Sequence, residues 1–389
     1  MTPQARVQAA IEVLDAVIAA ARGQGASADK IVADFFRARR YMGSGDRRAV
    51  RELAYRAIRH CGEIPASGRS AVLGLVGEDE GLFSLFDGSP HGPAPIVSGE
   101  IGAAPSLAPV WLLTELAASG IAGDDAKALL DRAPLDIRIN ALKGEPELPL
   151  AGEPTQAPAA LRYPHGTPVE QWDAFRAGQI EVQDSGSQIT CLAVAAAPGE
   201  TVIDLCAGAG GKTLALAAAM DNRGRLVACD VDRARLSRLD PRAERAGATI
   251  IESRLLGPGQ EHHSLGDLTG QADAVLVDAP CSGTGTWRRN PEARWRLNAK
   301  ELARVTAIQA RLLDLAATLL RPGGRLVLVT CSLLDSEGAD QAAAFLARHP
   351  EWRATTSALP AGTARGAGFR LEPARDATDG FFVAQFTAP

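Results

Sequence analysis

The chain has 389 residues, of which 46% are hydrophobic and 22% charged, a composition that excludes wholesale disorder. It contains no run of about 18 apolar residues, and charged residues interrupt its first apolar stretch. We therefore expect no membrane span and no secretory signal, and a cytoplasmic protein. The net charge of −5 conceals a basic N-terminal segment, because residues 1–70 carry 12 Lys or Arg against 7 Asp or Glu.

The N-terminal third of the chain is predicted to be helical. Apolar residues recur at helical spacing within residues 4–21, 28–40 and 46–60, and again between residues 107 and 132. Residues 63–109 are rich in Gly, Pro and Ser, which predicts irregular structure with short helices. These patterns indicate an all-α domain over residues 1–125.

A short mixed region follows. Apolar and polar residues alternate over residues 135–142, which predicts a strand. The Pro- and Gly-rich piece 144–168 predicts loops and short strands. We therefore expect a small α+β subdomain over residues 126–185.

From residue 186 onward, short apolar runs alternate with helical patterns. The runs that predict strands are 201–206, 225–230, 249–253, 273–280, 325–332 and 381–386. Buried strands that alternate with helices are typical of a parallel sheet covered on both faces, which is a Rossmann-like α/β fold over residues 186–389. Ligands of such sheets bind at the carboxyl ends of the strands. The residues expected along that edge are 206–212, 230, 252, 278–282 and 331–332.

A glycine-rich loop joins the first of these strands to a helix. Glycines allow a ligand to approach the backbone at a helix N-terminus. A P-loop is excluded because Cys206 occupies the position of its first glycine, and a dinucleotide fingerprint is incomplete because Thr213 replaces its last glycine. Two interpretations stay open: a binding loop for S-adenosylmethionine, whose ribose hydroxyls would bond to Asp230, and a structural turn without a ligand.

The six cysteines are scattered, and no Cys-x-x-Cys pair occurs, which argues against a disulfide framework and a structural zinc site. We expect no metal. Cys61, Cys191 and Cys229 are interpreted as small buried side chains. Cys281 and Cys331, in contrast, follow two predicted strands at the ligand edge, which favours a role in catalysis.

A thiol beside a methyl donor suits the alkylation of a carbon that is not itself nucleophilic, such as C5 of a pyrimidine. Addition of a thiolate to C6 makes C5 nucleophilic, and loss of the C5 proton and of the thiolate then restores the ring. A free thiol is only a few per cent ionised at neutral pH, so local activation is expected. Asp278 is the nearest candidate to bond or protonate N3 of the base.

Several motifs resemble the Sun/RsmB family of RNA cytosine-5 methyltransferases. They are DLCAGAGGKT (204–213), DAPCSGTGTWRRNPEARWR (278–296), TCS (330–332) and DGFFVA (379–384). Residues 134–143 and 178–188 resemble segments that precede the family's catalytic domain, and residues 39–59 resemble part of its NusB-like helical domain. The resemblance implies a class I S-adenosylmethionine-dependent methyltransferase domain over 186–389. It also implies a NusB-like RNA-binding domain over 1–125, shortened or remodelled at 63–109, and a small α+β RNA-binding segment over 126–185.

The resemblance also implies roles for single residues. Cys331 corresponds to the nucleophile that attacks C6, Cys281 to the cysteine that helps to release the product, and Asp278 to the acid near both base and cofactor. The implied cofactor-binding residues are Cys206, Ala207, Gly208, Ala209, Gly210, Gly211, Lys212, Asp230, Glu252 and Asp278. Lys212 is also expected to contact a carboxylate or a phosphate. The implied RNA-phosphate contacts are Arg288, Arg289, Arg294 and Arg296.

The leading hypothesis is S-adenosylmethionine-dependent methylation of cytosine C5 in RNA, with 16S rRNA as substrate, by a monomer that needs neither a metal nor a membrane. One alternative is a transfer-RNA methyltransferase. Another is a DNA cytosine-5 methyltransferase with Cys281 as nucleophile, against which the second cysteine and the helical N-terminal region argue. A third is a non-catalytic RNA-binding ribosome-assembly factor, which the intact Asp204, Asp230, Asp278, Cys281 and Cys331 disfavour.

Overall fold

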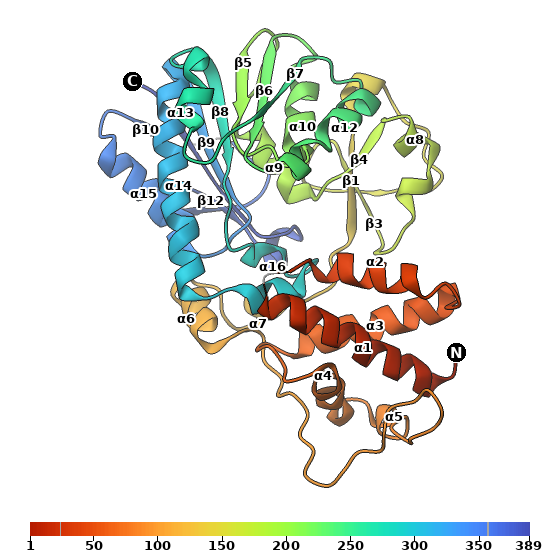
Figure 1. Cartoon of the computed structure of the whole chain (residues 1–389). Helices are drawn as coiled ribbons and strands as arrows, with labels where there is room; N and C mark the ends of the chain where they lie inside the picture. The colour runs from red at the N-terminus through yellow and green to blue at the C-terminus, as the bar shows by residue number, and fades with distance from the viewer. Residues whose placement is uncertain (24, 356–357) are drawn as a thin grey trace. The chain divides into compact units, whose positions relative to one another are not determined.

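The computed structural model describes residues 1–23, 25–355 and 358–389, which form two compact units (Figure 1). One unit comprises Met1–Asp131 together with Thr286–Ala299. The other comprises Arg132–Gly285 together with Lys300–Pro389. No helix in the described part of the chain is long and apolar enough to cross a membrane.

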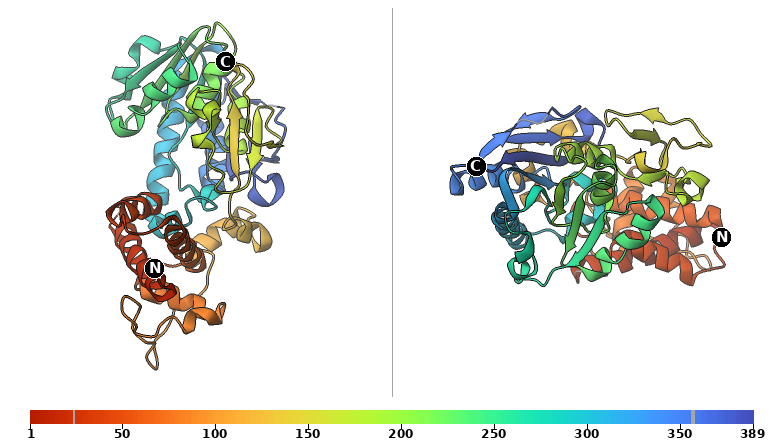
Figure 2. Two further views of the ribbon diagram at one scale, coloured as in Figure 1. Left: turned by 90° about the vertical axis from the view of Figure 1, so that its right-hand side faces the viewer. Right: turned by 90° about the horizontal axis from the view of Figure 1, so that it is seen from above.

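The first unit is helical, and its longest helices lie side by side (Figure 2). Its helices are α1 (Pro3–Arg22), α2 (Ala28–Ala38), α3 (Ser44–His60), α4 (Gly68–Gly74), α5 (Glu80–Phe83), α6 (Val110–Ala118) and α7 (Gly123–Ala128), with the 3₁₀ helix η1 (Leu75–Gly77). The short α4, η1 and α5 within residues 63–109 confirm the predicted mixture of irregular chain and short helices. The core formed by α1–α4 also includes Trp295, which belongs to the 3₁₀ helix η6 (Pro291–Arg296) far along the chain.

The second unit begins with a small antiparallel sheet in the order β2-β3-β1-β4. Its strands are β1 (Leu135–Ile139), β2 (Glu153–Pro154), β3 (Ala160–Tyr163) and β4 (Ile180–Val182), accompanied by η2 (Ala141–Lys143), η3 (Val169–Gln171) and α8 (Asp173–Arg176). Asp136 in β1 is buried and accepts two hydrogen bonds from Arg162 in β3, at 2.7 and 2.8 Å. Asp136 and Arg162 are directly opposite in neighbouring strands, so their ion pair adds to the stability that the small apolar core of this sheet provides.

The large sheet of the second unit is mixed. Its strands are β5 (Thr201–Asp204), β6 (Arg225–Asp230), β7 (Ile251–Leu255), β8 (Ala272–Asp278), β9 (Leu320–Thr330), β10 (Arg353–Thr355), β11 (Thr363–Arg365), β12 (Gly368–Leu371) and β13 (Phe381–Thr387). The run β7-β6-β5-β8-β9 is parallel, as the sequence predicts. The last strand, β13, is the exception, because it pairs with β9 in the antiparallel direction and continues the sheet to β12 and β11.

Helices cover both faces of this sheet (Figure 1). The apolar side chains of α9 (Ser185–Leu192), α10 (Gly211–Ala219), α11 (Arg233–Leu236) and α12 (Leu239–Ala246) pack on one face, and those of α14 (Ala299–Leu319) and α15 (Ala339–Arg348) on the other. Shorter helices are α13 (Glu261–Ser264), η4 (Gly266–Leu268), η5 (Thr284–Thr286), η7 (Asp335–Glu337) and α16 (Pro373–Asp376). Residues 233–246 form two separate helices, α11 and α12.

The strand order locates the place where such a sheet binds a ligand. The chain proceeds from β5 outward to β6 and β7, and then returns to β8 on the other side of β5. The loops after β5 and β8 consequently diverge, and the crevice between them is the usual binding site of a doubly wound sheet.

Candidate active site

Two thiol groups meet at the carboxyl ends of β8 and β9. Cys281 lies three residues after β8 and Cys331 directly after β9, and their Sγ atoms are 3.3 Å apart. Both side chains are partly exposed. The expectation that these cysteines share one edge of the sheet is confirmed, and a substrate that reaches this edge can contact sulfur.

The environment of Cys281 favours its neutral thiol. The hydrogen bond with Cys331 and burial raise the pKa of the Cys281 thiol well above its usual value, and the nearby Glu337 raises it further. A neutral thiol at Cys281 can be the donor in the contact between the two sulfur atoms. The raised pKa disfavours the thiolate of Cys281, which is the form that attacks carbon.

Glycines allow the two cysteine loops to contact the chain at the start of β13. The Gly285 N–H donates to the Cys331 carbonyl at 3.0 Å, and the Gly380 N–H donates to the Gly285 carbonyl at 2.8 Å. A Cβ atom at Gly285 would lie 2.1 Å from the Gly380 carbonyl oxygen, a distance that real Cβ atoms do not reach. Glycine at both positions therefore lets three separate segments of backbone meet beside the thiols.

An ion pair stands next to the cysteines. The Lys212 Nζ donates to Asp278 Oδ2 at 2.7 Å, which confirms the expectation that Lys212 contacts a carboxylate. Burial by itself would lower the pKa of Lys212, but Asp278 raises it above its usual value, so that Lys212 remains a cation at neutral pH. The ring of Phe381, whose centroid is 5.5 Å from Nζ, packs against this ammonium group.

The glycine-rich loop leaves its backbone open at the N-terminus of α10. Gly208 and Gly210 have positive φ angles of 56° and 85°, which side-chain-bearing residues rarely adopt. A Cβ at Gly210 would meet Leu239 at 2.1 Å, whereas a Cβ at Gly211 would meet no atom within 4 Å. The loop is thus packed against α12 on one side and open on the other, where backbone N–H groups at the start of a helix attract an anionic group.

Asp230 holds this loop in place. It is buried at the end of β6, and its two oxygens accept the Gly208 and Asp232 N–H groups, each at 2.7 Å. Each carboxylate oxygen has a second lone pair that can accept a further bond. The arrangement therefore supports a structural role for Asp230 and is compatible with the predicted contact to a hydroxyl.

A second acid, Asp204, lies at the end of β5. It is fully buried, and its Oδ2 accepts the Thr213 hydroxyl at 2.7 Å, while its Oδ1 accepts no bond from the described residues. Burial raises the pKa of Asp204 to about 7, and the negative charges of Asp278 and Asp230 add to the shift. A buried acceptor without a partner is costly, and a cationic ligand group beside it would relieve that cost.

Glu252 does not lie at the ligand edge, contrary to expectation. It pairs with Val227 in mid-strand, whereas Leu255 is the residue opposite Asp230 at the end of β6. Both carboxylate oxygens of Glu252 accept from Arg225 at 2.8 Å, on the exposed surface. The prediction is wrong because the strand begins and ends two residues later than the apolar run 249–253 suggests.

The basic stretch after Cys281 is also not a set of free phosphate ligands. Arg294 is 0% exposed and donates to the carbonyls of Ile58, Arg59 and Cys61 at the end of α3. Arg296 donates to the carbonyls of Ala20, Gly25 and Ala26, and Arg288 is 8% exposed. Arg289 is half-buried, and its contact with RNA stays a prediction.

The sequence pattern contains no sign of the polar residues that support the site. Glu337 and Gln309 are completely buried beneath the two cysteine loops. Neither belongs to a chemical motif, and a buried glutamate cannot be distinguished from a surface glutamate by spacing alone. The partnership of Asp204 and Thr213 could have been anticipated, because both residues flank the glycine loop.

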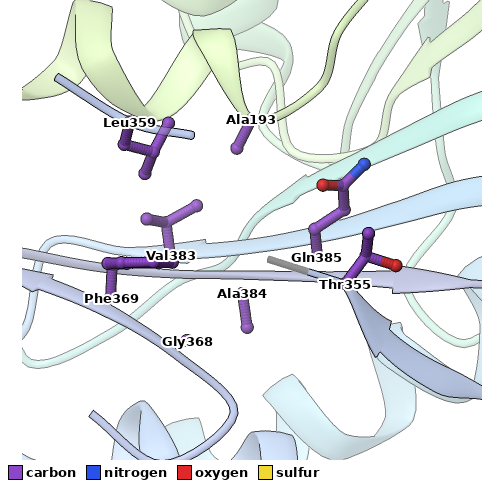
Figure 3. Close-up of a pocket in the computed structure, with 8 residues that line it drawn as sticks. All are labelled: Ala193, Thr355, Leu359, Gly368, Phe369, Val383, Ala384 and Gln385. Atoms are coloured by element: carbon purple, nitrogen blue, oxygen red, sulfur yellow. The ribbon is translucent and has the colours of Figure 1, made fainter. Parts of the chain in front are cut away.

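A small pocket lies outside this site. A pocket of about 10 Å³, lined by Ala193, Thr355, Leu359, Gly368, Phe369, Val383, Ala384 and Gln385, borders the antiparallel strands (Figure 3). It has room for about one water molecule and is too small for a cofactor. Within the described ranges, no three His, Cys, Asp or Glu side chains are grouped so that they could hold a metal ion.

Known proteins resemble this chain in sequence and in fold. The family model described as 16S rRNA methyltransferase RsmB/F matches residues 191–387. "Ribosomal RNA small subunit methyltransferase B" of Xanthomonas campestris pv. campestris is 35% identical over 291 residues, which are 71% of this chain and 65% of that protein. The chain spans about half to two thirds of the length of the curated relatives that it matches.

Solved structures show the same fold. The crystal structure of PH0851 matches with a TM-score of 0.76 and 25% identity, over 99% of each chain. The crystal structure of NSun6 from Pyrococcus horikoshii with SFG matches with a TM-score of 0.58 and 19% identity, over 71% of this chain and 97% of that one. The sheet unit thus has a methyltransferase fold, and this chain belongs to the RsmB/F family of 16S rRNA methyltransferases.

Proposed function

We propose that this protein methylates C5 of cytosine in RNA, with S-adenosylmethionine as methyl donor and Cys331 as the nucleophile. The observation that carries the proposal is the pair of sulfur atoms, 3.3 Å apart, at the carboxyl edge of a parallel sheet. The Lys212–Asp278 pair belongs to the same edge. Methylation of a carbon that is not nucleophilic requires such a sulfur atom.

The residues around the glycine loop fit the proposed cofactor. The open backbone at Gly211 suits its carboxylate, and the unpartnered Oδ1 of Asp204 suits its ammonium group. Cys206 to Gly211, Lys212, Asp230 and Asp278 are the proposed contacts. The Pyrococcus NSun6 structure was solved with SFG, an analogue of S-adenosylmethionine, which supports the same donor here. When bound, S-adenosylmethionine supplies an electrophilic methyl group.

The chain's own residues perform the remaining chemistry. The Cys331 sulfur adds to C6, and the ammonium of Lys212 and the carboxyl of Asp278 bind the polar edge of the base where negative charge develops. After C5 has gained the methyl group, water at the partly exposed edge takes the C5 proton. The electrons of the broken C–H bond re-form the double bond between C5 and C6, and Cys331 leaves C6 as a thiolate. Cys281, bonded to Cys331, assists this release. Partial burial limits the access of water to these groups, which strengthens each electrostatic contact.

Two single substitutions test this assignment. Cys331→Ala is expected to abolish methyl transfer because the nucleophile is lost. Cys281→Ala is expected to trap a covalent RNA adduct, seen as a shifted band on a denaturing gel. Cys61→Ala, which removes a buried thiol from the helical unit, is the matched control and should leave the rate unchanged. An adduct in Cys331→Ala would reverse the two roles, and full activity of Cys331→Ala would refute the mechanism.

The substrate and the roles of the other regions are part of the same proposal. The names of the curated relatives support 16S rRNA as substrate. We assign RNA binding to a NusB-like domain over residues 1–125 and to the α+β segment 126–185, and methyl transfer to residues 186–389. Bisulfite sequencing of total RNA from a deletion strain should reveal one unmodified cytosine in 16S rRNA. Loss of a modified cytosine from transfer RNA instead would identify the alternative substrate.

A further inference from the structure

Beneath the two cysteines lies a buried carboxylate that the proposed reaction does not use. Glu337 is 0% exposed and belongs to η7, five residues after Ser332. Its Oε1 accepts the Ser282 N–H at 2.7 Å and the Gln309 amide at 3.2 Å. Its Oε2 accepts the Ser332 hydroxyl at 2.6 Å and the Ser282 hydroxyl. All four donors are electrically neutral, so the carboxylate is stabilised only by hydrogen bonds.

The residues bonded to Glu337 are those that directly follow the two cysteines. Ser282 comes after Cys281 and Ser332 after Cys331, and their hydroxyls are 3.2 Å apart. The Thr284 hydroxyl extends the network, since it lies 3.1 Å from the Ser332 hydroxyl and accepts the Leu333 N–H at 2.9 Å. One carboxylate therefore joins two loops that are about 50 residues apart in sequence.

A third element completes the arrangement. Gln309, fully buried in α14, donates both to Glu337 and to the Pro280 carbonyl, the latter at 2.9 Å. The position of Cys281 is thus determined from both sides, through Pro280 before it and Ser282 after it. Each oxygen of the Glu337 carboxylate has two donors in this network, so a displacement of either loop would leave a buried polar group without a partner.

We propose that Glu337 is the positioning residue of this site, which holds the chain after both cysteines so that their sulfur atoms stay in contact. The inference rests on the proposed function, since it assigns Glu337 to the cysteine pair of that reaction. Its negative charge has a second effect, because it opposes the ionisation of Cys281. Glu337 acts through the cysteines and does not itself touch the base.

The test compares Glu337→Gln with Glu372→Gln in the full-length chain, without RNA or cofactor. Glu372 is a buried glutamate of the same unit whose carboxylate bonds to Arg370 and not to a serine beside the cysteines. Alkylation by iodoacetamide is followed at Cys281 and Cys331 by mass spectrometry across a pH series. In Glu337→Gln, Cys281 should react at lower pH, about tenfold faster for each unit by which its pKa falls. Glu372→Gln should leave the profile of Cys281 unchanged.

Hydrogen exchange tests the positioning itself. In Glu337→Gln the amides of residues 281–285 and 331–337 should exchange faster, while the strands β5 and β6 keep their protection. With RNA and cofactor present, kcat should fall about 100-fold at nearly constant KM, the size expected when a reacting group moves by about 1 Å. If Glu337→Gln does not fold, Ser332→Ala removes a single donor and gives a smaller change in the same measurements.

The outcomes separate this inference from the proposed function. An unchanged alkylation profile together with unchanged exchange of both loops would overturn the role of Glu337, even in an active enzyme. A shifted profile and faster loop exchange support that role, even if the wild-type chain methylates no RNA, in which case only the proposed function fails.

Discussion

The stretch from Asp278 to Ala299 contains two neighbouring segments with different roles. Residues 278–285 belong to the sheet unit and carry Asp278, Cys281 and the serine that bonds to Glu337. Residues 286–299 belong to the helical unit, where Trp295 enters the core and Arg294 is buried. A motif that is continuous in sequence thus contributes to the candidate site in its first segment and to packing in its second. A charged residue in a motif is therefore no evidence of a ligand-binding role until the burial of its side chain is known.

The physical reason for the second role lies at the end of α3. The last carbonyls of a helix have no partner within it, and a cation is favoured at that end of the helix dipole. Arg294 supplies donors to Ile58 and Arg59, and Trp295 donates to the Cys61 carbonyl at 2.7 Å. The guanidinium group thus supplies donors to the last carbonyls of α3, which the C-cap residue Cys61 leaves without partners.

The largest expected effect is a loss of activity when a residue of the first segment, 278–285, is changed. Asp278→Asn removes the charge that pairs with Lys212 and should lower kcat by about 10³-fold, within the range for groups that act on protons or charge in the transition state. The melting of the helical unit should not change. Single-turnover methylation and hydrogen exchange of α1–α3 measure the two quantities. Loss of protection in the helices would contradict the separation of roles.

The second effect is a loss of stability when a residue of the second segment, 286–299, is changed. Arg294→Met leaves buried carbonyls at the end of α3 without donors and should destabilise the helical unit by about 3 kcal/mol. Hydrogen exchange of α3 reports the change, and Arg304→Met, at an exposed pair with Glu301, is the control. If the variant instead keeps its stability and loses RNA affinity, Arg294 is a ligand of RNA after all.

The third effect concerns pH and the acid at the end of β5. Because burial raises the pKa of Asp204 from 3.8 to about 7, the folded state retains a proton that the unfolded chain releases at lower pH. The stability that the protonated Asp204 contributes to the folded state is therefore fully present below about pH 4. It is lost as the pH rises to about 7, where the buried carboxyl must ionise. Asp204→Asn should flatten the dependence of Tm on pH in this window. An equally steep dependence in the variant would show that another group causes it.

The smallest effect concerns the exposed arginines of the helical unit. Arg40, Arg48 and Arg51 are exposed on or next to α2 and α3. If they contact phosphates, replacing all three by Gln should lower the slope of log K against log salt by about 2, at roughly 0.7 per contact with single-stranded RNA. Filter binding across a salt series measures the slope. An unchanged slope would place the RNA elsewhere.

The local sequence pattern was sufficient to predict the parallel strands and the edge of the sheet at which a ligand is expected. Alternating apolar runs and helices predicted β5, β6, β8 and β9, and the ends of parallel strands must share an edge. The meeting of Cys281 with Cys331 could therefore be anticipated from sequence. The position of Glu252 could not, because a shift of two residues along a strand moves a side chain away from the edge without changing the apolar pattern.

The amino-acid sequence alone thus determined the type of fold, the glycine loop, the two thiols at one edge of the sheet and the family resemblance, because each depends on local spacing or on residue identity. Only the tertiary structure decided which charges are buried. Arg294 and Glu337 resemble surface residues in the sequence, yet both are enclosed by segments that lie far from them in the chain. Burial depends on contacts between distant residues, and it is burial that makes one charge a structural donor and the other a support for the site.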